Sequence, residues 1–151
     1  MSEFNDQIIA EFRANGGRVD SAGFGSALVL LHTKGARTGL ERVNPAMSLR
    51  DGHAWLVVGS AMGAARDPAW TVNLRAHPDI VIEVASAGGV QTVPVTAQEL
   101  DGAEYDAAFA RFVRRSSAFA AYQDRATTRR LPVIRLAPRA DAEQPQAAAG
   151  S

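Results

Sequence analysis

Three basic side chains lie close together near residue 37. They are those of Lys34, Arg37 and Arg42, opposed by a single acid, Glu41. Arginine forks match the geometry of phosphate and carboxylate groups, and each charge-assisted hydrogen bond contributes about 1.5–3 kcal/mol. Glycines at 35 and 39 bracket a tight turn whose backbone N–H groups can converge on an oxyanion. This basic turn (residues 34–42) therefore predicts an anion site, and a solvated basic turn between strands is the alternative.

A second group of residues able to line a ligand follows in the segment 59–73. Asp67 as N-cap and Pro68 as first helical residue predict a short helix that carries Trp70 and Asn73 on one face. An indole beside a carboxamide could line an aromatic ligand and fix its orientation. Core packing of Trp70 beside an exposed Asn73 is the alternative. Backbone at Gly59, where a strand ends, could approach a planar ring closely.

Other chemistries lack the residues they need. Cysteine is absent, which excludes disulfides, thiolate metal sites and thiol catalysis. The histidines His32, His53 and His77 share no metal-ligand spacing. Ser60 lacks the glycine two residues before it that a nucleophile elbow requires. The 16 basic and 16 acidic residues give a formal net charge of zero, so no bulk field favours nucleic acid or anionic lipid.

The hydrophobic pattern predicts the elements that must position these groups. Ile8 and Phe12 recur on one face of a helix over 3–14, which Gly16-Gly17 end. Its acidic polar face favours packing on the protein's own domain or on a second subunit. Later helices are predicted from Pro68 to His77-Pro78 and over about 99–115, and Phe119 and Tyr122 would share a face of a short helix. Strands are predicted over 27–32, 42–49, 55–59, 80–84, 90–96 and 131–136, with hairpin turns at 50–53 and 86–89 and a bulge or edge at Pro94.

Short strands joined by hairpins, with helices between them, predict a mainly β fold with helices (α+β), a small antiparallel barrel after an N-terminal helix. One domain is expected over 1–137. The segment 138–151 has too little apolar content to order itself, which predicts a disordered tail. The N-terminus lacks a signal-peptide pattern and no apolar run approaches the ~20 residues of a membrane helix. A cytoplasmic location is therefore expected, with a peripheral position at the membrane left open.

Together these segments resemble the deazaflavin-dependent nitroreductase family, whose members are split-barrel reductases that use coenzyme F420. The resemblance runs from about Phe4 to Pro138. It is carried by the segments FNDQIIAEFRANGG, TKGARTGLERVNP, RDGH, GSAMGAARDPAWTVNLRAHPDI and YQDRATTRRLPVIRLAP. It implies an FMN-binding-like split β-barrel with the cofactor in a groove.

The resemblance also implies roles for residues at matching positions. The phosphate and glutamate tail of the cofactor would be held by Arg37, Thr38 and Arg42. The deazaflavin would be lined by Val43, Asn44, Pro45, Ala46, Met47, Gly59, Ser60 and Ala61, with Ala69, Trp70, Thr71 and Asn73 as the other wall. The substrate would be faced by Met47, Ser60, Phe119 and Tyr122. Ala61, Thr71 and Phe119 depart from the lysine and tyrosines common in the family, which affects the substrate more than the cofactor.

The activity implied is hydride transfer from C5 of the reduced deazaflavin to a small electrophilic acceptor, such as a quinone, an activated enone or a nitroaromatic. Ser60 and Tyr122 are candidates to hydrogen-bond the acceptor or relay a proton. Two alternatives stay open: an FMN-dependent reductase on the same barrel, and a non-catalytic deazaflavin-binding protein. Exposed strand edges and the apolar face of the N-terminal helix also leave a homodimer open.

Overall fold

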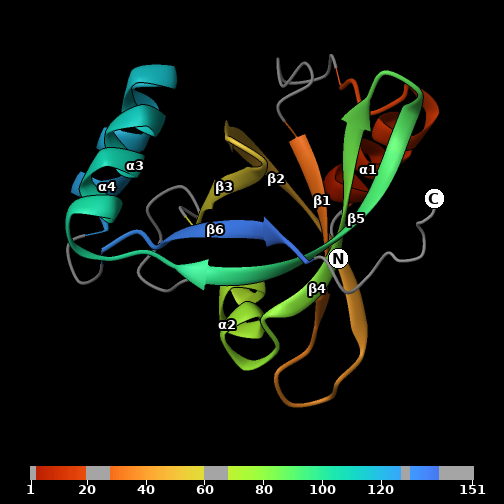
Figure 1. Ribbon diagram of the computed structural model, residues 1–151, viewed down its shortest axis with the longest axis horizontal. Helices are drawn as coiled ribbons and strands as arrows, with labels where there is room; N and C mark the ends of the chain where they lie inside the picture. Colours follow the sequence, from red (N-terminus) through yellow and green to blue (C-terminus); the bar gives the residue numbers. More distant parts are fainter. Residues whose placement is uncertain (1–2, 20–27, 60–67, 127–129, 140–151) are drawn as a thin grey trace.

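A computed structural model describes residues 3–19, 28–59, 68–126 and 130–139. Within them an antiparallel barrel closes in the order β1-β2-β3-β6-β5-β4 (Figure 1). The strands are β1 (Leu28–Lys34), β2 (Glu41–Asp51), β3 (Ala54–Val58), β4 (Asp79–Ser86), β5 (Gly89–Glu99) and β6 (Val133–Pro138). The mainly β, antiparallel barrel expected from the sequence is confirmed.

Side chains alternate between the inside and the outside of the barrel, as the period of a strand requires. The interior is filled by a cluster that includes Val29 and Leu31 of β1, Val57 of β3 and Ile82 of β4. The helix α2 (Ala69–Ala76) lies at one end of the barrel, and its Leu74 belongs to the same cluster (Figure 1). The barrel is thus a packed core with no lumen for a ligand, and binding must use its ends or its outer surface.

The N-terminal helix α1 (Glu3–Ala14) covers part of the outer surface. Its Ile8 and Phe12 are buried against Leu28 and Leu30, which point outward from β1. The expected helix and its packing on its own domain are confirmed. The apolar face of α1 is therefore already covered by the barrel.

Two further helices cover another part of the outer surface. α3 (Gly102–Arg115) and α4 (Ala118–Arg125) lie together on the side of the barrel away from α1 (Figure 1). Phe112 of α3 and Phe119 of α4 are buried in a cluster with Leu56 of β3 and Val133 of β6. Ser116 ends α3, as expected.

Several boundaries differ from the expectation. Pro68 is the N-cap and not the first helical residue of α2, because its ψ of 153° is extended. Asp67 and Ala27 lie outside the described residues. The predicted third helix begins at Gly102, because β5 continues to Glu99 in its ladder with β6. The barrel extends beyond residue 137, since β6 includes Pro138 and the Arg139 N–H donates to the Pro94 carbonyl at 3.0 Å.

Both predicted hairpin turns are confirmed. β2 and β3 are joined at Gly52, whose φ of +65° lies in the left-handed region that favours glycine. β4 and β5 are joined before Gly89. Pro94 pairs with Val81 of β4 and lies just outside the β5–β6 ladder, which begins at Val95. At the end of this ladder a proline, which cannot donate, does not interrupt the run of paired residues.

Candidate cofactor site

The basic turn joins β1 to β2 at the end of the barrel next to α2. Its backbone is held by its own hydrogen bonds: Gly35 donates to the Leu40 carbonyl at 2.9 Å and Gly39 donates to the Gly35 carbonyl at 2.8 Å. The Leu40 N–H donates to Thr38 Oγ1 at 3.2 Å, and the Ala36 N–H donates to Asn73 Oδ1 at 3.0 Å. Four backbone donors of the turn are therefore already engaged. The expectation that its N–H groups converge on an oxyanion is wrong for these four.

The charged side chains of the turn are available instead. Lys34, Arg37 and Arg42 are exposed, and no carboxylate of the described residues pairs with them. Other cations of the barrel do pair: Arg75 with Glu99 at 2.8 Å and Arg135 with Asp51 at 3.1 Å. Anion binding at this end would therefore rest on side chains.

The strand β2 leads from the basic turn to the aromatic residues of α4. From Arg42 to Met47 it covers five steps of about 3.3 Å, or roughly 17 Å. β1 pairs with it over Glu41–Met47, whereas β3 pairs with it only over Ser48–Asp51. Along 41–47, therefore, one edge of β2 has no strand partner among the described residues. Gly35 and Leu40 form a hydrogen-bonded pair, and such pairs alternate with non-hydrogen-bonded pairs along an antiparallel ladder. Val43 and Met47 belong to non-hydrogen-bonded pairs with β1, so their N–H groups point away from β1, toward the edge without a strand partner.

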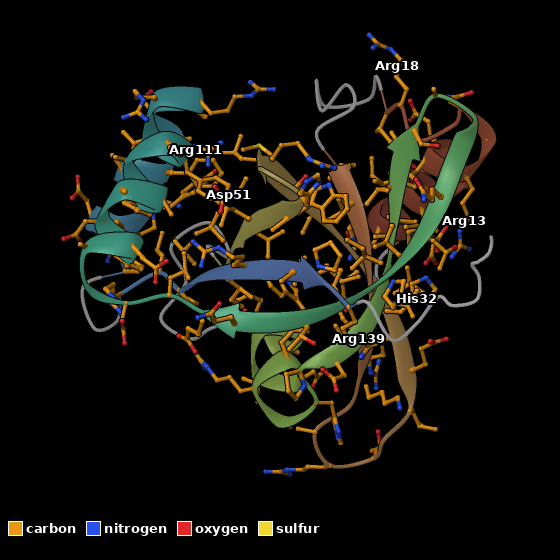
Figure 2. The ribbon with its side chains drawn as sticks, viewed as in Figure 1. Arg13, Arg18, His32, Asp51, Arg111 and Arg139 are labelled. Carbon is orange, nitrogen blue, oxygen red and sulfur yellow. The ribbon has the colours of Figure 1, made fainter. Side chains whose placement is uncertain are left out.

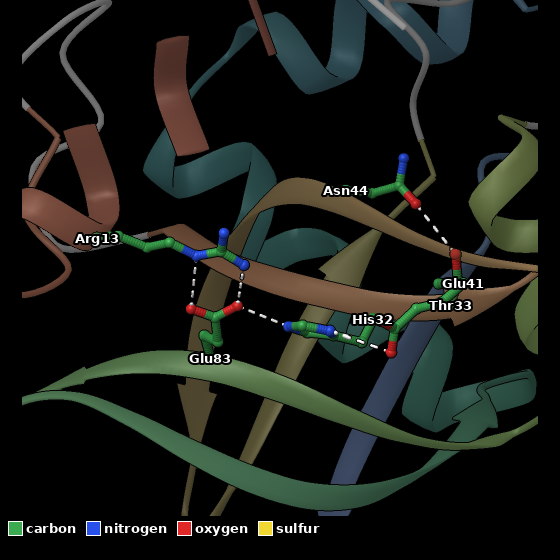
Figure 3. Close-up of polar contacts among 6 residues, drawn as sticks. All are labelled: Arg13, His32, Thr33, Glu41, Asn44 and Glu83. Carbon is green, nitrogen blue, oxygen red and sulfur yellow. Dashed lines mark hydrogen bonds and ion pairs between the residues drawn. The ribbon is translucent and has the colours of Figure 1, made fainter. Parts of the chain in front are cut away.

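Successive side chains of β2 point alternately into the barrel and to its outer surface, so the residues predicted to line the deazaflavin ring lie on two different faces. Ala46 is buried in the interior cluster, and Asn44 accepts from the Thr33 hydroxyl at 3.1 Å (Figure 3). Val43 and Met47 lie on the outer face, where each is half-buried against an apolar cluster, and Pro45 shares their parity. A ligand on the outer surface could thus touch the side chains of only every second residue in this stretch.

The predicted residues of α2 differ in their access to a ligand. Ala69 is exposed and Trp70 is half-buried against the interior cluster. Asn73 is buried and binds the basic turn through Ala36. Thr71 is fully buried, and its Oγ1 has no hydrogen-bond partner among the described residues. α2 therefore offers Ala69 and part of the indole, and Asn73 acts by fixing the turn.

Gly59 has a packing reason for lacking a side chain. A Cβ there would lie 2.6 Å from Thr71 Oγ1 and 3.0 Å from Pro132 Cγ, closer than side chains tolerate. The Gly59 N–H also donates to the Pro132 carbonyl at 2.9 Å. The space beside Gly59, where a planar ring was expected to approach the backbone, is thus filled by Thr71 and Pro132. Ser60 and Ala61 lie outside the described residues.

The predicted substrate residues lie at the far end of β2. Phe119 is buried, and its ring meets those of Phe112 and Tyr122 edge to face at 5.4 and 5.8 Å between centroids. Met47 and Tyr122 are half-buried against the same cluster. The structure therefore brings three of the four predicted substrate residues together. Phe119 contributes mainly packing, and Met47 and Tyr122 retain access to solvent.

A partly buried ion-pair network lies on the outer surface below α1 (Figure 3). The Arg13 guanidinium donates to both oxygens of Glu83, at 3.1 and 2.7 Å. His32 Nε2 lies 2.6 Å from the same carboxylate, and His32 Nδ1 lies 3.3 Å from Glu41. Hydrogen bonding from Arg13, aided by that from His32, holds the pKa of Glu83 below its usual range against the opposing effect of burial.

Sequence reasoning missed this network. His32 has no metal-ligand spacing, and its partners Glu83 and Glu41 come from two other strands, so no local pattern predicts the pairing. The available signal was Glu83, a lone acid in the otherwise apolar run Ile80–Val84. A charge in a buried strand requires a partner.

Comparison with known proteins decides the family. Residues 6–138 match the sequence profile described as F420H(2)-dependent quinone reductase. The chain belongs to this family. An F420H(2)-dependent quinone reductase of Mycobacterium tuberculosis is 38% identical over 111 residues, which cover 72% of this chain and 71% of the relative. The chain is accordingly an F420H(2)-dependent oxidoreductase, and coenzyme F420 is its cofactor.

Solved structures agree with this family assignment. An F420-H2 dependent reductase is 30% identical, with a TM-score of 0.64 over 73% of this chain and 93% of that one. A structure described as a domain-swapped dimer is 26% identical, with a TM-score of 0.66 over 87% of this chain and 96% of that one. A heme storage protein from Vibrio cholerae, 15% identical with a TM-score of 0.58, shares the fold alone. The split barrel of the F420-dependent reductases is confirmed.

The residues of β2 and its ends fit this cofactor. A deazaflavin with a phosphate and glutamate tail needs cations at one end and an apolar, partly aromatic surface at the other. Arg37 and Arg42 lack carboxylate partners among the described residues. Met47, which packs against the same cluster as Tyr122, lies roughly 17 Å further along the strand. The unpaired edge of β2 supplies backbone donors between them.

Proposed function

We propose that this reductase transfers a hydride from reduced coenzyme F420 to a quinone that lies beside Tyr122. The observation that carries the proposal is the placement of two groups along β2. Arg37 and Arg42, which have no carboxylate partner among the described residues, lie at one end, and the half-buried side chains of Met47 and Tyr122 lie at the other. The relative from M. tuberculosis is named a quinone reductase, which supports a quinone as the acceptor. When bound, the reduced deazaflavin supplies the hydride.

The chain's own residues bind and orient the reactants in this proposal. Arg37 and Arg42 hold the anionic tail, and Asn73 fixes the turn that carries Arg37 through its bond to Ala36. The unpaired edge and outer face of β2 orient the ring. Met47 and Tyr122 exclude water on the acceptor side, and the Tyr122 hydroxyl hydrogen-bonds the quinone oxygen. Holding the reacting atoms about 3–3.5 Å apart supplies most of the rate enhancement.

The proposal predicts separate effects on binding and turnover. Arg42→Ala removes a charge-assisted hydrogen bond of about 1.5–3 kcal/mol, so the Kd for coenzyme F420 should rise more than tenfold. Cofactor fluorescence measures the Kd, and the recovery of 420 nm absorbance with menadione measures oxidation of the reduced cofactor. Arg114→Ala removes an exposed charge from α3 and is the matched control, with no expected change.

Two results would contradict the proposal. Equal Kd values for wild type, Arg42→Ala and Arg114→Ala would place the anionic tail elsewhere. Tight binding of the cofactor with no turnover of menadione or other quinones would identify a deazaflavin-binding protein and not a quinone reductase.

We further propose a homodimer and a cytoplasmic location. The 26% identical structure described as a domain-swapped dimer supports the first, and sedimentation equilibrium tests it by giving the mass of the particle. None of the helices in the described residues is long and apolar enough to cross a membrane. Separation of cell extracts into soluble and membrane fractions tests the second.

A further inference from the structure

His32 lies between two carboxylates. Its Nε2 is 2.6 Å from Glu83 and its Nδ1 is 3.3 Å from Glu41 (Figure 3). A neutral imidazole carries one N–H and one lone pair, so it can donate to only one of the two. A lone pair that faces a carboxylate oxygen is repelled by it. The contacts of His32 therefore require both ring nitrogens to carry a proton.

The two carboxylates are held with unequal strength. Glu83 is 10% exposed and also receives both guanidinium bonds from Arg13. Glu41 is 64% exposed, and His32 is its one charged partner among the described residues. When His32 loses a proton, the remaining N–H stays with buried Glu83, because an unsatisfied buried carboxylate costs more than a solvated one. The exposed Glu41 carboxylate is then released.

The released carboxylate lies beside Lys34, one cation of the basic turn. Glu41 is directly opposite Lys34 in the β1–β2 register, whereas Arg42, the next residue, points to the other face of β2. Side chains directly opposite in an antiparallel pair have Cβ atoms about 4.5–5.5 Å apart, within reach of an ion pair. Free Glu41 can therefore neutralise a charge that would otherwise bind an anionic ligand.

We propose that His32 is a positioning residue for the cofactor: in its doubly protonated form it holds the Glu41 carboxylate away from Lys34 and keeps that cation of the basic turn available. The charged groups around it are Arg13 of α1, Glu83 of β4, Glu41 of β2 and Lys34 of β1. Affinity for coenzyme F420 should therefore fall when His32 loses a proton. This inference rests on the proposed function, since it assumes that the turn binds the cofactor's tail.

A double-mutant cycle tests the positioning role. We measure the Kd for oxidised coenzyme F420 by fluorescence between about pH 5.5 and pH 8.5, a range that spans the ordinary histidine pKa of about 6.5. His32→Gln should weaken binding about two- to fivefold at low pH, the effect of one exposed ion pair. Glu41→Gln should bind no more weakly than wild type, and His32→Gln/Glu41→Gln should regain the affinity of Glu41→Gln.

Comparing the variants with wild type separates the effect of His32 from the pH dependence that the cofactor itself brings to binding. All variants share the cofactor's contribution, so the pH dependence specific to wild type should vanish in both single variants. Glu104→Gln is the matched control: it neutralises an exposed, ion-paired carboxylate on α3 and should keep the wild-type profile. Glu41 is exposed, so its variant tests the proposal even where His32→Gln fails to fold. In the cofactor-free protein at low pH, nitrogen NMR should show protons on both ring nitrogens of His32.

Three results would overturn the inference. The first is weakening by His32→Gln that Glu41→Gln does not restore, which indicates a packing role for the histidine. The second is an unchanged wild-type pH profile in Glu41→Gln, and the third is a singly protonated ring at low pH. If Arg42→Ala weakens binding in the same experiments, the proposed function stands without the inference. If Arg42→Ala has no effect on the Kd, the proposed function is contradicted, and the inference that rests on it is contradicted with it.

Discussion

Asn73 joins the two ligand-binding segments that the sequence singled out separately. Its side chain comes from α2, is 7% exposed and accepts the Ala36 N–H of the basic turn. The amide therefore sets the position of the turn relative to the helix that carries Trp70. Spacing along the chain could predict that both segments belong to a site. It could not predict this bond, because its partners are 37 residues apart.

Gly59 lies in a contact that a single methyl group would break. A Cβ there would meet Thr71 Oγ1 at 2.6 Å and Pro132 Cγ at 3.0 Å. Gly59→Ala should therefore lower the free energy of unfolding by about 1–3 kcal/mol, the usual effect of overpacking. Urea denaturation measures the change. Gly88→Ala is the control, because a Cβ at Gly88 meets nothing within 4 Å. Equal stabilities for the two variants would show that α2 can move away from β3 at little cost.

At the scale of elements, α3 is bound to the barrel by ion pairs as well as by apolar packing. Asp51, in the β2–β3 hairpin, receives Arg111 of α3 at 3.4 Å and Arg135 of β6 at 3.1 Å (Figure 2). The Arg111 guanidinium also donates to the Arg50 carbonyl. The hairpin thus anchors the helix pair that carries Tyr122.

Removing the charge of Asp51 should loosen that anchor. Asp51→Asn weakens two partly exposed ion pairs, so we expect a loss of about 1 kcal/mol in stability. Amide hydrogen exchange should be faster in α3 than in β1 or β4. Asp124→Asn, which changes an exposed side chain of α4, is the control and should leave amide exchange in α3 unchanged. Equal acceleration across the barrel would mean that Asp51 supports the fold as a whole.

The elements themselves were largely predictable from the sequence. The first helix follows from Ile8 and Phe12 at helical spacing, and both hairpins follow from glycines where the chain reverses. The predicted starts of α2 and α3 were less accurate. A proline can be the N-cap or the first residue of a helix, and β5 continues for as long as it pairs with β6, which delays the start of α3. Periodicity describes one segment at a time, whereas ends of strands are decided by their neighbours.

The candidate site was predictable in part. The exposed cations Arg37 and Arg42 and the grouping of Met47 with Tyr122 follow the expected pattern. The sequence could not show that Ala46 faces the interior, because the face of a strand depends on which side the core lies. Nor could it show that Thr71 and Pro132 fill the space beside Gly59. The assignment of individual residues to the cofactor stays a prediction.

At the scale of the whole molecule, the last described residue contacts both β4 and β5. Arg139 donates from its backbone to Pro94, and its guanidinium lies 3.5 Å from Asp79 of β4. Across the barrel, Arg13, Glu83 and His32 join α1, β4 and β1. Both sets of contacts link segments far apart in sequence, so we expect them to form late in folding, after the local hairpins.

The contacts of Glu83 with Arg13 and His32 should make the stability of the fold depend on pH. Arg13 first, and then His32, lower the pKa of Glu83 in the folded protein. The unfolded chain then binds more protons in the acid range, so stability rises with pH there. The contribution of Glu83 is complete above the ordinary carboxyl pKa of about 4.3 and is lost as the pH falls through the lowered value.

Glu83→Gln should therefore cost stability at neutral pH and little in acid. We expect a loss of about 1–2 kcal/mol at pH 7, and the gap to wild type should close below about pH 4. Urea denaturation across this range measures both. Glu99→Gln is the matched control: Glu99 also accepts two bonds from one arginine, at 2.8 and 3.0 Å, but its side chain is 39% exposed against 10% for Glu83. Solvent screening should make its loss smaller. Equal losses for the two variants would mean that burial does not strengthen the network, and a gap that persists in acid would assign the effect to packing.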